Sequence, residues 1–510
     1  MESSFSRARR AALAVGAGVL ASLALAGPSF ADEPVGGVAC QTDSNLTGTT
    51  DGQISGRGAT FATKAQQALI AGYTTDVCGK KMLSYNDATA EGLGPAGLPT
   101  GSGAGQNAAS WRSDFYGGSD IPYDQTTWST IGTGACGALT ATKPADTGLM
   151  PAQSNPCTDP DSFAGQGIGA TGFMSFPYVG SSVAMAVNLQ AARDCGGHAL
   201  GTLRFTGLQM SRIMGGDIQN WNDAFLRSNG QNSALQFCNV AITRVVRQDK
   251  SGTTQIYKNY FSHANGDRTG SPAATCQAPG SGSPRVWAGD LNLDGNNRDW
   301  PGSDAPTDNN ADAPDQPAQN GCSAIKRSHV GGSPAGSGAG ALLTVLNATP
   351  GGVGYADLPD VATSALVKPQ VANPAGVYQS PNNGTNANCD FSTSLTLPGG
   401  GDPNSSVGLD GADNYAYNQA GNHVDATFQG TGYPICGVTF MLVWTGLSDT
   451  SGTADNNPIS RMKPNERRTL YSYVTYVLSS AGQRRLQNIN YAPIPASWLD
   501  SLLPGFQANF

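Results

Sequence analysis

The sequence predicts an α/β fold, because helical and strand-like segments alternate along the chain. Helical periodicity covers residues 62–74, 206–214, 254–263, 338–348 and 465–487. Short apolar runs typical of strands cover residues 179–189, 241–247 and 437–444. The chain is also long enough for two domains with cores of their own, since about 480 residues remain when residues 1–31 are set aside.

Residues 1–31 are predicted to be a signal peptide, which would not be part of the fold. A basic stretch at residues 7–10 is followed by apolar residues 11–26, a run too short to span a bilayer comfortably. Residues 29–31 (Ser-Phe-Ala) fit a cleavage site, so the mature chain would begin at Asp32. No cysteine stands there to carry a lipid. We therefore expect an exported protein, periplasmic, extracellular or at the cell surface, with no lipid anchor.

Ten cysteines in an exported chain predict a disulfide framework. The chain has no CxxC pair, so neither a zinc site nor a redox site is expected. Spacing alone does not determine connectivity. Pairing between neighbours is a working hypothesis, and the pairs would be Cys40–Cys78, Cys136–Cys157, Cys195–Cys238, Cys276–Cys322 and Cys389–Cys436. We expect at least four disulfides, each of which would close a long loop.

The composition argues against two classes of partner. Charged residues make up 13% of the chain, and the formal net charge is −8. This charge argues against nucleic acid or an anionic membrane as a partner. An anionic ligand would need local donors, such as backbone N–H groups and one arginine, rather than a long-range positive field.

Three segments are predicted to be surface insertions, because they are rich in Gly, Pro and Asn. They cover residues 124–170, 265–330 and 371–430. Within the second, residues 290–299 resemble the start of a calcium loop, with oxygen-bearing side chains at alternate positions before a glycine. Pro301 stands where such a loop needs an acidic residue. A solvated turn is therefore the preferred interpretation, and no metal site is predicted.

The strongest functional signal is the run RQDKSGTT at residues 247–254. Gly252 lets backbone N–H groups approach a ligand, and the hydroxyls of Ser251 and Thr253 flank it. A helix that starts here directs the positive end of its dipole to the same point. Arg247 offers a planar fork of donors. The run predicts a cradle for a tetrahedral oxyanion, and an ordinary helix N-cap is the plainer alternative.

Three further segments place glycines beside a hydroxyl or carboxyl group: residues 56–61 (GRGATF), 101–106 (GSGAGQ) and 114–120 (DFYGGSD). In order and in internal spacing, the four segments closely resemble the phosphate-binding proteins that serve ABC-type phosphate importers. Residues 215–223, 349–355 and 490–495 extend the resemblance. It therefore runs from about Ser55 to the C-terminus, interrupted by the insertions.

The resemblance implies a type II periplasmic-binding-protein-like fold, in which two α/β domains are joined by two crossing strands and the ligand cleft lies between them. Residues 179–189 would form the first crossing strand, and residues 352–358 the return. Domain one would then comprise residues 45–177 plus 356–510. Domain two would comprise residues 178–355.

The resemblance also implies the residues that contact phosphate: Thr60, Phe61, Ser102, Asp120, Arg247, Ser251, Gly252 and Thr253. Phe61 and Gly252 would contribute their backbone N–H groups. Asp249 would orient Arg247 without touching the ligand itself.

Asp120 is expected to decide which anion binds. A carboxylate among donors is sensible only if the ligand carries a proton to donate, as phosphate does and sulfate or molybdate does not at neutral pH. A receptor for sulfate or molybdate is the alternative within the same class. A secreted phosphatase-like hydrolase that uses Ser251 or Thr253 is the alternative from another class, although none of the four histidines lies in a site motif.

We therefore expect an extracytoplasmic receptor that closes around inorganic phosphate and delivers it to the membrane permease of an ABC importer. Such a protein would be no enzyme and would need neither a cofactor nor a metal. We expect it to act as a monomer.

Overall fold

The computed structural model describes residues 53–79, 82–87, 114–119, 173–228, 230–248, 251–265, 300, 315, 317–318, 321–328, 338–391, 430–444 and 464–509. The predicted signal peptide, the calcium-like segment and the insertion at 124–170 lie outside the described residues. All described residues belong to one unit, Val35–Phe510. Among them, no helix combines the length and the apolar character that a membrane crossing requires.

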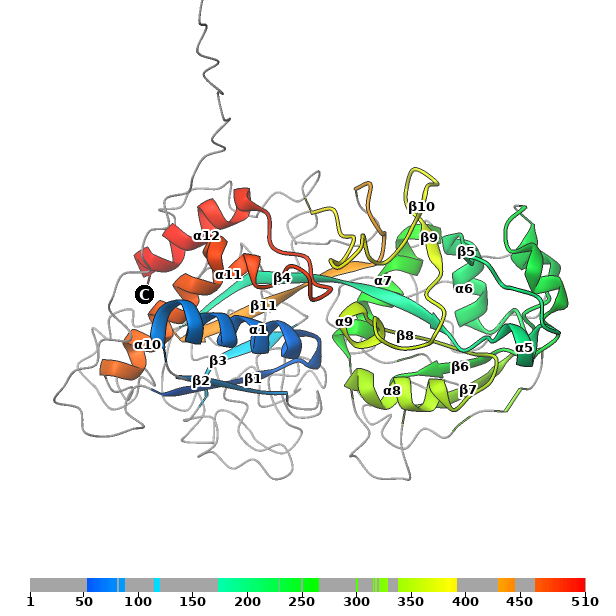
Figure 1. The fold of residues 1–510 in the computed structure, drawn as a ribbon, viewed down its shortest axis with the longest axis horizontal. Coiled ribbons are helices and arrows are strands. Elements are labelled where there is room, and N and C mark those ends of the chain that lie inside the picture. Colours follow the sequence, from blue (N-terminus) through cyan, green and yellow to red (C-terminus); the bar gives the residue numbers. More distant parts are fainter. Residues whose placement is uncertain are drawn as a thin grey trace, which may run out of the picture. The chain divides into compact units, whose positions relative to one another are not determined.

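An eight-stranded mixed sheet forms the frame of the fold (Figure 1). Its strands follow the order β2 (Leu83–Asp87), β1 (Ile54–Gly58), β3 (Asp114–Ser119), β11 (Cys436–Trp444), β4 (Phe173–Val187), β8 (Gly352–Asp357), β6 (Thr243–Val246) and β7 (Ala324–Arg327). β1, β2 and β3 are parallel at one end of this order, and β6, β7 and β8 are parallel at the other. β11 and β4 run antiparallel to their neighbours between them. The predicted α/β class is confirmed.

The long strand β4 belongs to both halves of the sheet. It pairs with β11 from Phe173 to Ser182 and with β8 from Val183 to Val187. Residues 176–187 are all buried, which explains the continuous apolar run in the sequence, because a strand covered on both faces has no solvent-facing positions. The predicted strand 179–189 therefore overlaps β4, which starts earlier, and the predicted strand 352–358 corresponds to β8.

Four helices lie near β1, β2 and β3, and three of them come from the C-terminal part of the chain. They are α1 (Thr63–Tyr73), α10 (Pro464–Val477), α11 (Ser480–Arg484) and α12 (Ala496–Asn509). A π-helical turn, Thr74–Cys78, extends α1. The single helix predicted for residues 465–487 is two helices, because the Ser479 side chain accepts from the N–H of Gly482 at 3.2 Å and starts α11.

Three helices surround the parallel strands β6, β7 and β8. They are α6 (Gly207–Gly215), α7 (Gly252–Asn265) and α8 (Gly338–Asn347). Successive residues of β8 face different helices. A Cβ added at Gly354 would lie 3.1 Å from Leu342 and 3.3 Å from Leu346 of α8. The next residue, Tyr355, stacks on Tyr257 of α7, so α7 and α8 cover opposite faces of β8.

Shorter elements complete the described chain. They are the short helices α5 (Ala191–Asp194) and α9 (Leu358–Val361), the 3-10 helices Thr60–Ala62, Ala224–Arg227 and Ser233–Phe237, and a three-stranded sheet of order β10 (Tyr378–Gln379), β9 (Gln370–Ala372) and β5 (Arg204–Phe205). β9 and β10 lie at the start of the predicted insertion 371–430, so this part of it is built into the fold.

Two of the proposed disulfides are confirmed in the described residues: Cys195–Cys238 and Cys389–Cys436. Cys78 and Cys322 are disulfide-bonded as well. The other four cysteines lie outside the described residues. Pairing between neighbours therefore holds wherever both partners are described.

Candidate functional site

The candidate site begins at the carboxyl edge of the parallel strands β6, β7 and β8. Parallel strands end at the same edge of a sheet, and open α/β sheets bind their ligands there. Arg247 directly follows β6, Ser328 directly follows β7 and Asp357 is the last residue of β8. The N–H of Gln248 donates to the Ser328 hydroxyl at 3.1 Å, which ties the end of β6 to the end of β7.

The helix α7 starts at this edge, and Ser251 caps it. The Ser251 hydroxyl accepts from the N–H of Thr254 at 3.3 Å, and the Ser251 carbonyl accepts from the N–H of Gln255 at 3.1 Å. The first N–H groups of a helix have no acceptor within it, and they carry its positive partial charge. Gly252 and Thr253 supply these groups. Since Ser251 uses only a lone pair as a cap, its hydroxyl proton is still available to a ligand.

Arg247 is a buried cation beside this helix start. Only 4% of the residue is exposed, and its backbone N–H donates to the Tyr355 hydroxyl at 3.4 Å. The same tyrosine hydroxyl shares a 2.6 Å hydrogen bond with Thr254 of α7. A guanidinium keeps its positive charge even when buried. The backbone that follows β6, the strand β8 and the first turn of α7 are thus joined through the Tyr355 hydroxyl.

The ring of Tyr355 holds this arrangement in place. It stacks on Tyr257 of α7 with centroids 4.6 Å apart and on Trp300 with centroids 5.6 Å apart. Tyr257 is fully buried, and burial raises its pKa well above the ordinary value for tyrosine. Tyr257 therefore remains neutral across the physiological pH range.

A carboxylate absent from the predicted site also lies at this edge. The Thr253 hydroxyl donates to Asp357 Oδ1 at 3.0 Å, and both residues are buried. Asp357 lies two residues beyond the segment 349–355, which carries part of the family resemblance. Its proximity to Thr253 had no signal in the sequence, because the two residues are separated by 104 positions.

Tyr491 links Phe61 to the end of β8, because it bonds to Phe61 and lies near Asp357. The Tyr491 hydroxyl donates to the Phe61 carbonyl at 2.6 Å. Burial and the nearby charges of Asp360 and Asp357 raise the pKa of Tyr491 well above its ordinary value. Lys64, at the start of α1, forms an ion pair with Asp360 at 2.8 Å. The segment that contains Phe61 is therefore held next to the end of β8.

The structure thus brings together four predicted residues, Arg247, Ser251, Gly252 and Thr253, and we call them the cradle. Ser102, Asp120 and Asp249 lie outside the described residues, as does the side chain of Thr60. Their contacts with a ligand stay predictions. The described residues contain no cluster of three or more His, Cys, Asp or Glu side chains that could hold a metal ion.

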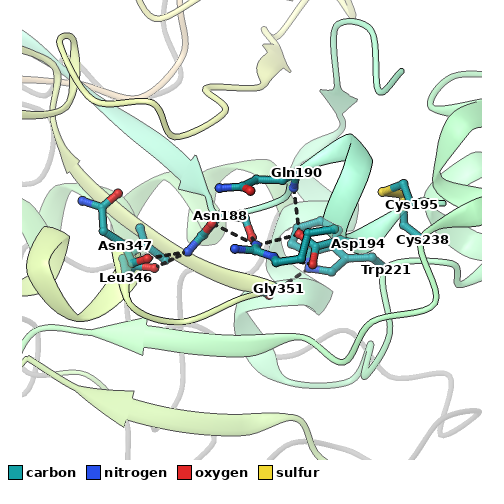
Figure 2. Close-up of polar contacts among 10 residues, drawn as sticks. Asn188, Gln190, Asp194, Cys195, Trp221, Cys238, Leu346, Asn347 and Gly351 are labelled. Carbon is teal, nitrogen blue, oxygen red and sulfur yellow. Dashed lines mark hydrogen bonds and ion pairs between the residues drawn. A yellow bond between two sulfur atoms is a disulfide. The ribbon is translucent and has the colours of Figure 1, made fainter. Parts of the chain in front are cut away.

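A second polar cluster occupies the opposite, amino ends of β6 and β8 (Figure 2). Asn188 follows β4, and its side-chain amide donates to the carbonyls of Leu346 and Asn347, both at 2.9 Å. Its carbonyl oxygens, on the backbone and the side chain, both accept from Arg193 at 3.1 Å. We call this group the Asn188 cluster.

The rest of the Asn188 cluster is also paired internally. Asp194 accepts from Arg193 and from the N–H of Gln190, and Trp221 donates to the carbonyl of Gly351 at 2.9 Å. Burial raises the pKa of the Asp194 carboxyl, but the hydrogen bonds from Arg193 and Gln190 outweigh burial and bring the pKa below its usual value. The cluster fastens the end of β4 to the turn between α8 and β8.

Comparison with protein families identifies the frame of this site. Residues 43–446 match a family model described as a PBP superfamily domain. The chain belongs to the PBP superfamily. Members of this superfamily are extracytoplasmic binding proteins. In this PBP-superfamily chain the cradle lies within the matched region, and so does the Asn188 cluster.

Among solved structures, this PBP-superfamily chain is similar to a phosphate-binding protein from Stenotrophomonas maltophilia, with 15% identity over 88% of this chain and 93% of that one, at a TM-score of 0.46. It is also similar to an ancestral soluble variant of the human phosphate-binding protein, with 15% identity over the same shares of the chains, at a TM-score of 0.49. Comparison with curated protein sequences gave no match.

Proposed function

We propose that this protein is an extracytoplasmic receptor that binds inorganic phosphate and delivers it to the membrane permease of an ABC importer. The cradle carries the proposal. A buried arginine, a serine hydroxyl with a free proton and the first N–H groups of α7 all lie at one sheet edge. Such donors in a site away from water suit a compact tetrahedral anion.

Two observations and one prediction support the same function. The PBP superfamily consists of binding proteins, and the hydroxyls of Ser251 and Thr253 bond to the N–H of Thr254 and to Asp357 rather than to a histidine that could activate them as nucleophiles. The predicted signal peptide places the protein outside the cytoplasm, which is where an importer collects its ligand. Thr60, Phe61, Ser102 and Asp120 would complete the ligand shell, and Asp249 would orient Arg247. We expect a monomer that needs no cofactor.

Calorimetric titration of the purified protein with phosphate and with sulfate tests the proposal. We expect saturable binding of phosphate and much weaker binding of sulfate. Comparable affinity for the two anions would favour the alternative of a receptor for sulfate or molybdate. Steady release of phosphate from a generic phosphate ester would instead favour the phosphatase-like alternative.

Asp120→Asn tests the predicted source of specificity. A carboxylate that accepts the ligand's proton contributes roughly 1.5–3 kcal/mol, and it repels an anion that has no proton. Asparagine removes the charge and can donate as well as accept. We expect the phosphate-to-sulfate affinity ratio to fall at least about tenfold. An unchanged ratio, measured at one ionic strength, would remove Asp120 from the site.

A further inference from the structure

The two hydroxyls that flank Gly252 have partners of opposite kinds, which leave one hydroxyl as a donor and the other as an acceptor. The Ser251 oxygen accepts from the N–H of Thr254, so its proton remains available. The Thr253 hydroxyl instead donates to Asp357 at 3.0 Å. An ionised carboxylate can only accept, so the Thr253 proton is used, and its oxygen keeps lone pairs alone for a ligand. Toward a ligand, Ser251 is a donor and Thr253 is an acceptor.

The Asp357 carboxylate is fixed in this role. It ends β8, where the residue pairs with Val183 of β4, and only 1% of it is exposed. Two residues earlier, Tyr355 is held by Thr254 and by its stacked rings. Asp357 also occupies the N-cap position of α9, yet its side chain does not cap that helix. Its side chain faces Thr253 instead.

An acceptor next to donors matches a particular kind of anion. A tetrahedral ligand that has ionised oxygens and also one hydroxyl group can accept hydrogen bonds from Ser251 and Arg247 while its hydroxyl group donates to Thr253. A fully ionised ligand has no proton for Thr253 and meets a lone pair there, with the charge of Asp357 behind it.

We propose, on the basis of the phosphate-receptor function above, that Asp357 makes the Thr253 oxygen an acceptor for a hydroxyl group of the ligand, in addition to the predicted acceptor Asp120. In this way Asp357 helps the site to prefer phosphate over sulfate. The hydrogen bonds run from the ligand hydroxyl to Thr253 Oγ1 and from the Thr253 hydroxyl to Asp357 Oδ1. No proton leaves the ligand. Asp357 is thus a positioning residue that sets the polarity of a hydroxyl in the cradle.

The test measures the phosphate-to-sulfate affinity ratio by calorimetry in the full chain at neutral pH. The variants are Asp357→Asn, Thr253→Val and the two combined. We expect each single substitution to lower the ratio by roughly tenfold to hundredfold, the factor that corresponds to one hydrogen bond with a charged group. The double variant should differ from either single variant by less than about threefold in this ratio, because both substitutions remove the same Thr253–Asp357 hydrogen bond.

Asp223→Asn is the matched control. It removes a carboxylate that accepts from the N–H of Phe225 at 2.7 Å and takes no part in the cradle. We expect the ratio to stay within about twofold of wild type in this variant. Circular dichroism and thermal unfolding identify the folded variants. If Asp357→Asn does not fold, Thr253→Val alone decides, and an unchanged ratio in that variant overturns the inference.

The outcomes separate the inference from the function on which it rests. If the wild-type protein binds neither anion, the proposed function fails and the inference fails with it. If wild type prefers phosphate and Asp357→Asn keeps that preference, only the inference fails. Asp357→Asn can also be compared in the wild-type background and in the Thr253→Val background. If it lowers the ratio by the same factor in both, the charge of Asp357 acts through space, and the role of the Thr253 hydroxyl is refuted.

Discussion

The strands β6 and β8 carry a polar cluster at each end, and the two clusters use their polar groups differently. At the amino ends, the Asn188 cluster joins side-chain and backbone groups of the chain to one another, including both sides of the Asn188 amide. At the carboxyl ends, the cradle presents the first N–H groups of α7, the Ser251 proton and the Arg247 charge. One end fastens the scaffold, whereas the other has the Ser251 proton and the first N–H groups of α7 to offer.

This difference supports the proposal that the carboxyl ends of the strands form the binding edge. Buried polar groups are usually paired, because an unpaired one loses its hydrogen bonds to water. A cluster that satisfies its own groups contributes to the stability of the fold. A cluster with positive charge and donors beyond its own acceptors can be completed by an anion. Substitutions at the two ends should therefore alter different properties, and the following predictions test this division.

The largest effect is expected from removal of the Cys195–Cys238 disulfide next to the Asn188 cluster (Figure 2). The cysteines are 43 residues apart. A bond across a loop of this length stabilises the fold by about 4 kcal/mol in the chain-entropy model. Denaturant unfolding of the Cys195→Ala, Cys238→Ala variant should show this loss. Phosphate affinity, measured well below the unfolding temperature, should stay within about twofold of wild type.

Arg247→Ala should have the next largest effect, on binding rather than on the scaffold. It deletes the permanent charge of the cradle, and charge-assisted hydrogen bonds contribute roughly 1.5–3 kcal/mol each. We expect affinity for every oxyanion to fall about a hundredfold or more, as measured by calorimetry. Arg212→Ala is the control, because Arg212 lies over the Phe225 ring, 4.5 Å from its centroid, and takes no part in the cradle. Equal losses in both variants would remove Arg247 from the site.

Asn188→Ala should reverse this pattern. It removes the two hydrogen bonds that the side-chain amide donates to the carbonyls of Leu346 and Asn347. Of these two carbonyls, that of Leu346 keeps another donor, the N–H of Thr349. Loss of buried hydrogen bonds of this kind should lower the free energy of unfolding by about 2–3 kcal/mol. Asn222→Ala, which removes one surface contact to Asn239, should change it by less than about 0.5 kcal/mol. A loss of phosphate affinity in Asn188→Ala would break the proposed division between the two ends.

The smallest effect concerns pH. The pKa of Asp194 is lower in the fold than in the unfolded chain, so its ion pair stabilises the protein above the unfolded pKa of about 4. That contribution is lost as the pH falls through the lower, folded pKa. It should stay below about 1 kcal/mol, because the Arg193 side chain is 36% exposed and solvent screens the pair. Acid titration of unfolding should be less steep in Asp194→Asn, and identical curves would contradict this.

Local sequence predicted much of the frame. Periodicity located α1, α6, α7 and α8 to within a few residues, and the apolar runs located β4, β6 and β11. The helix predicted for residues 465–487 was wrong in one respect, since Ser479 interrupts it. A capping side chain competes with the helix for backbone hydrogen bonds. The spacing of apolar residues contains no information about this competition, so it did not predict the interruption.

The cradle was also predictable in part. The order of Arg247, Ser251, Gly252 and Thr253 is local, because all four lie between the end of β6 and the first residues of α7. Asp357 and Tyr491 were not predictable as neighbours of the cradle. Asp357 meets Thr253 across 104 positions, and Tyr491 meets Phe61 across 430. No spacing rule links residues so far apart, and only the order of the strands brings them together.

The sequence by itself determined which segments form helices and strands, where α7 starts and which donors stand at that start, because propensity, apolar periodicity and capping act between near neighbours. The cysteine pairs did not follow from it, and the structure confirmed two pairs of the working hypothesis. Only the tertiary structure decided that Asp357 accepts the hydrogen bond of the Thr253 hydroxyl and that Asn188 bonds to the carbonyls at the opposite end of the same strands. Those contacts depend on the sheet order, which is set by packing over the whole chain.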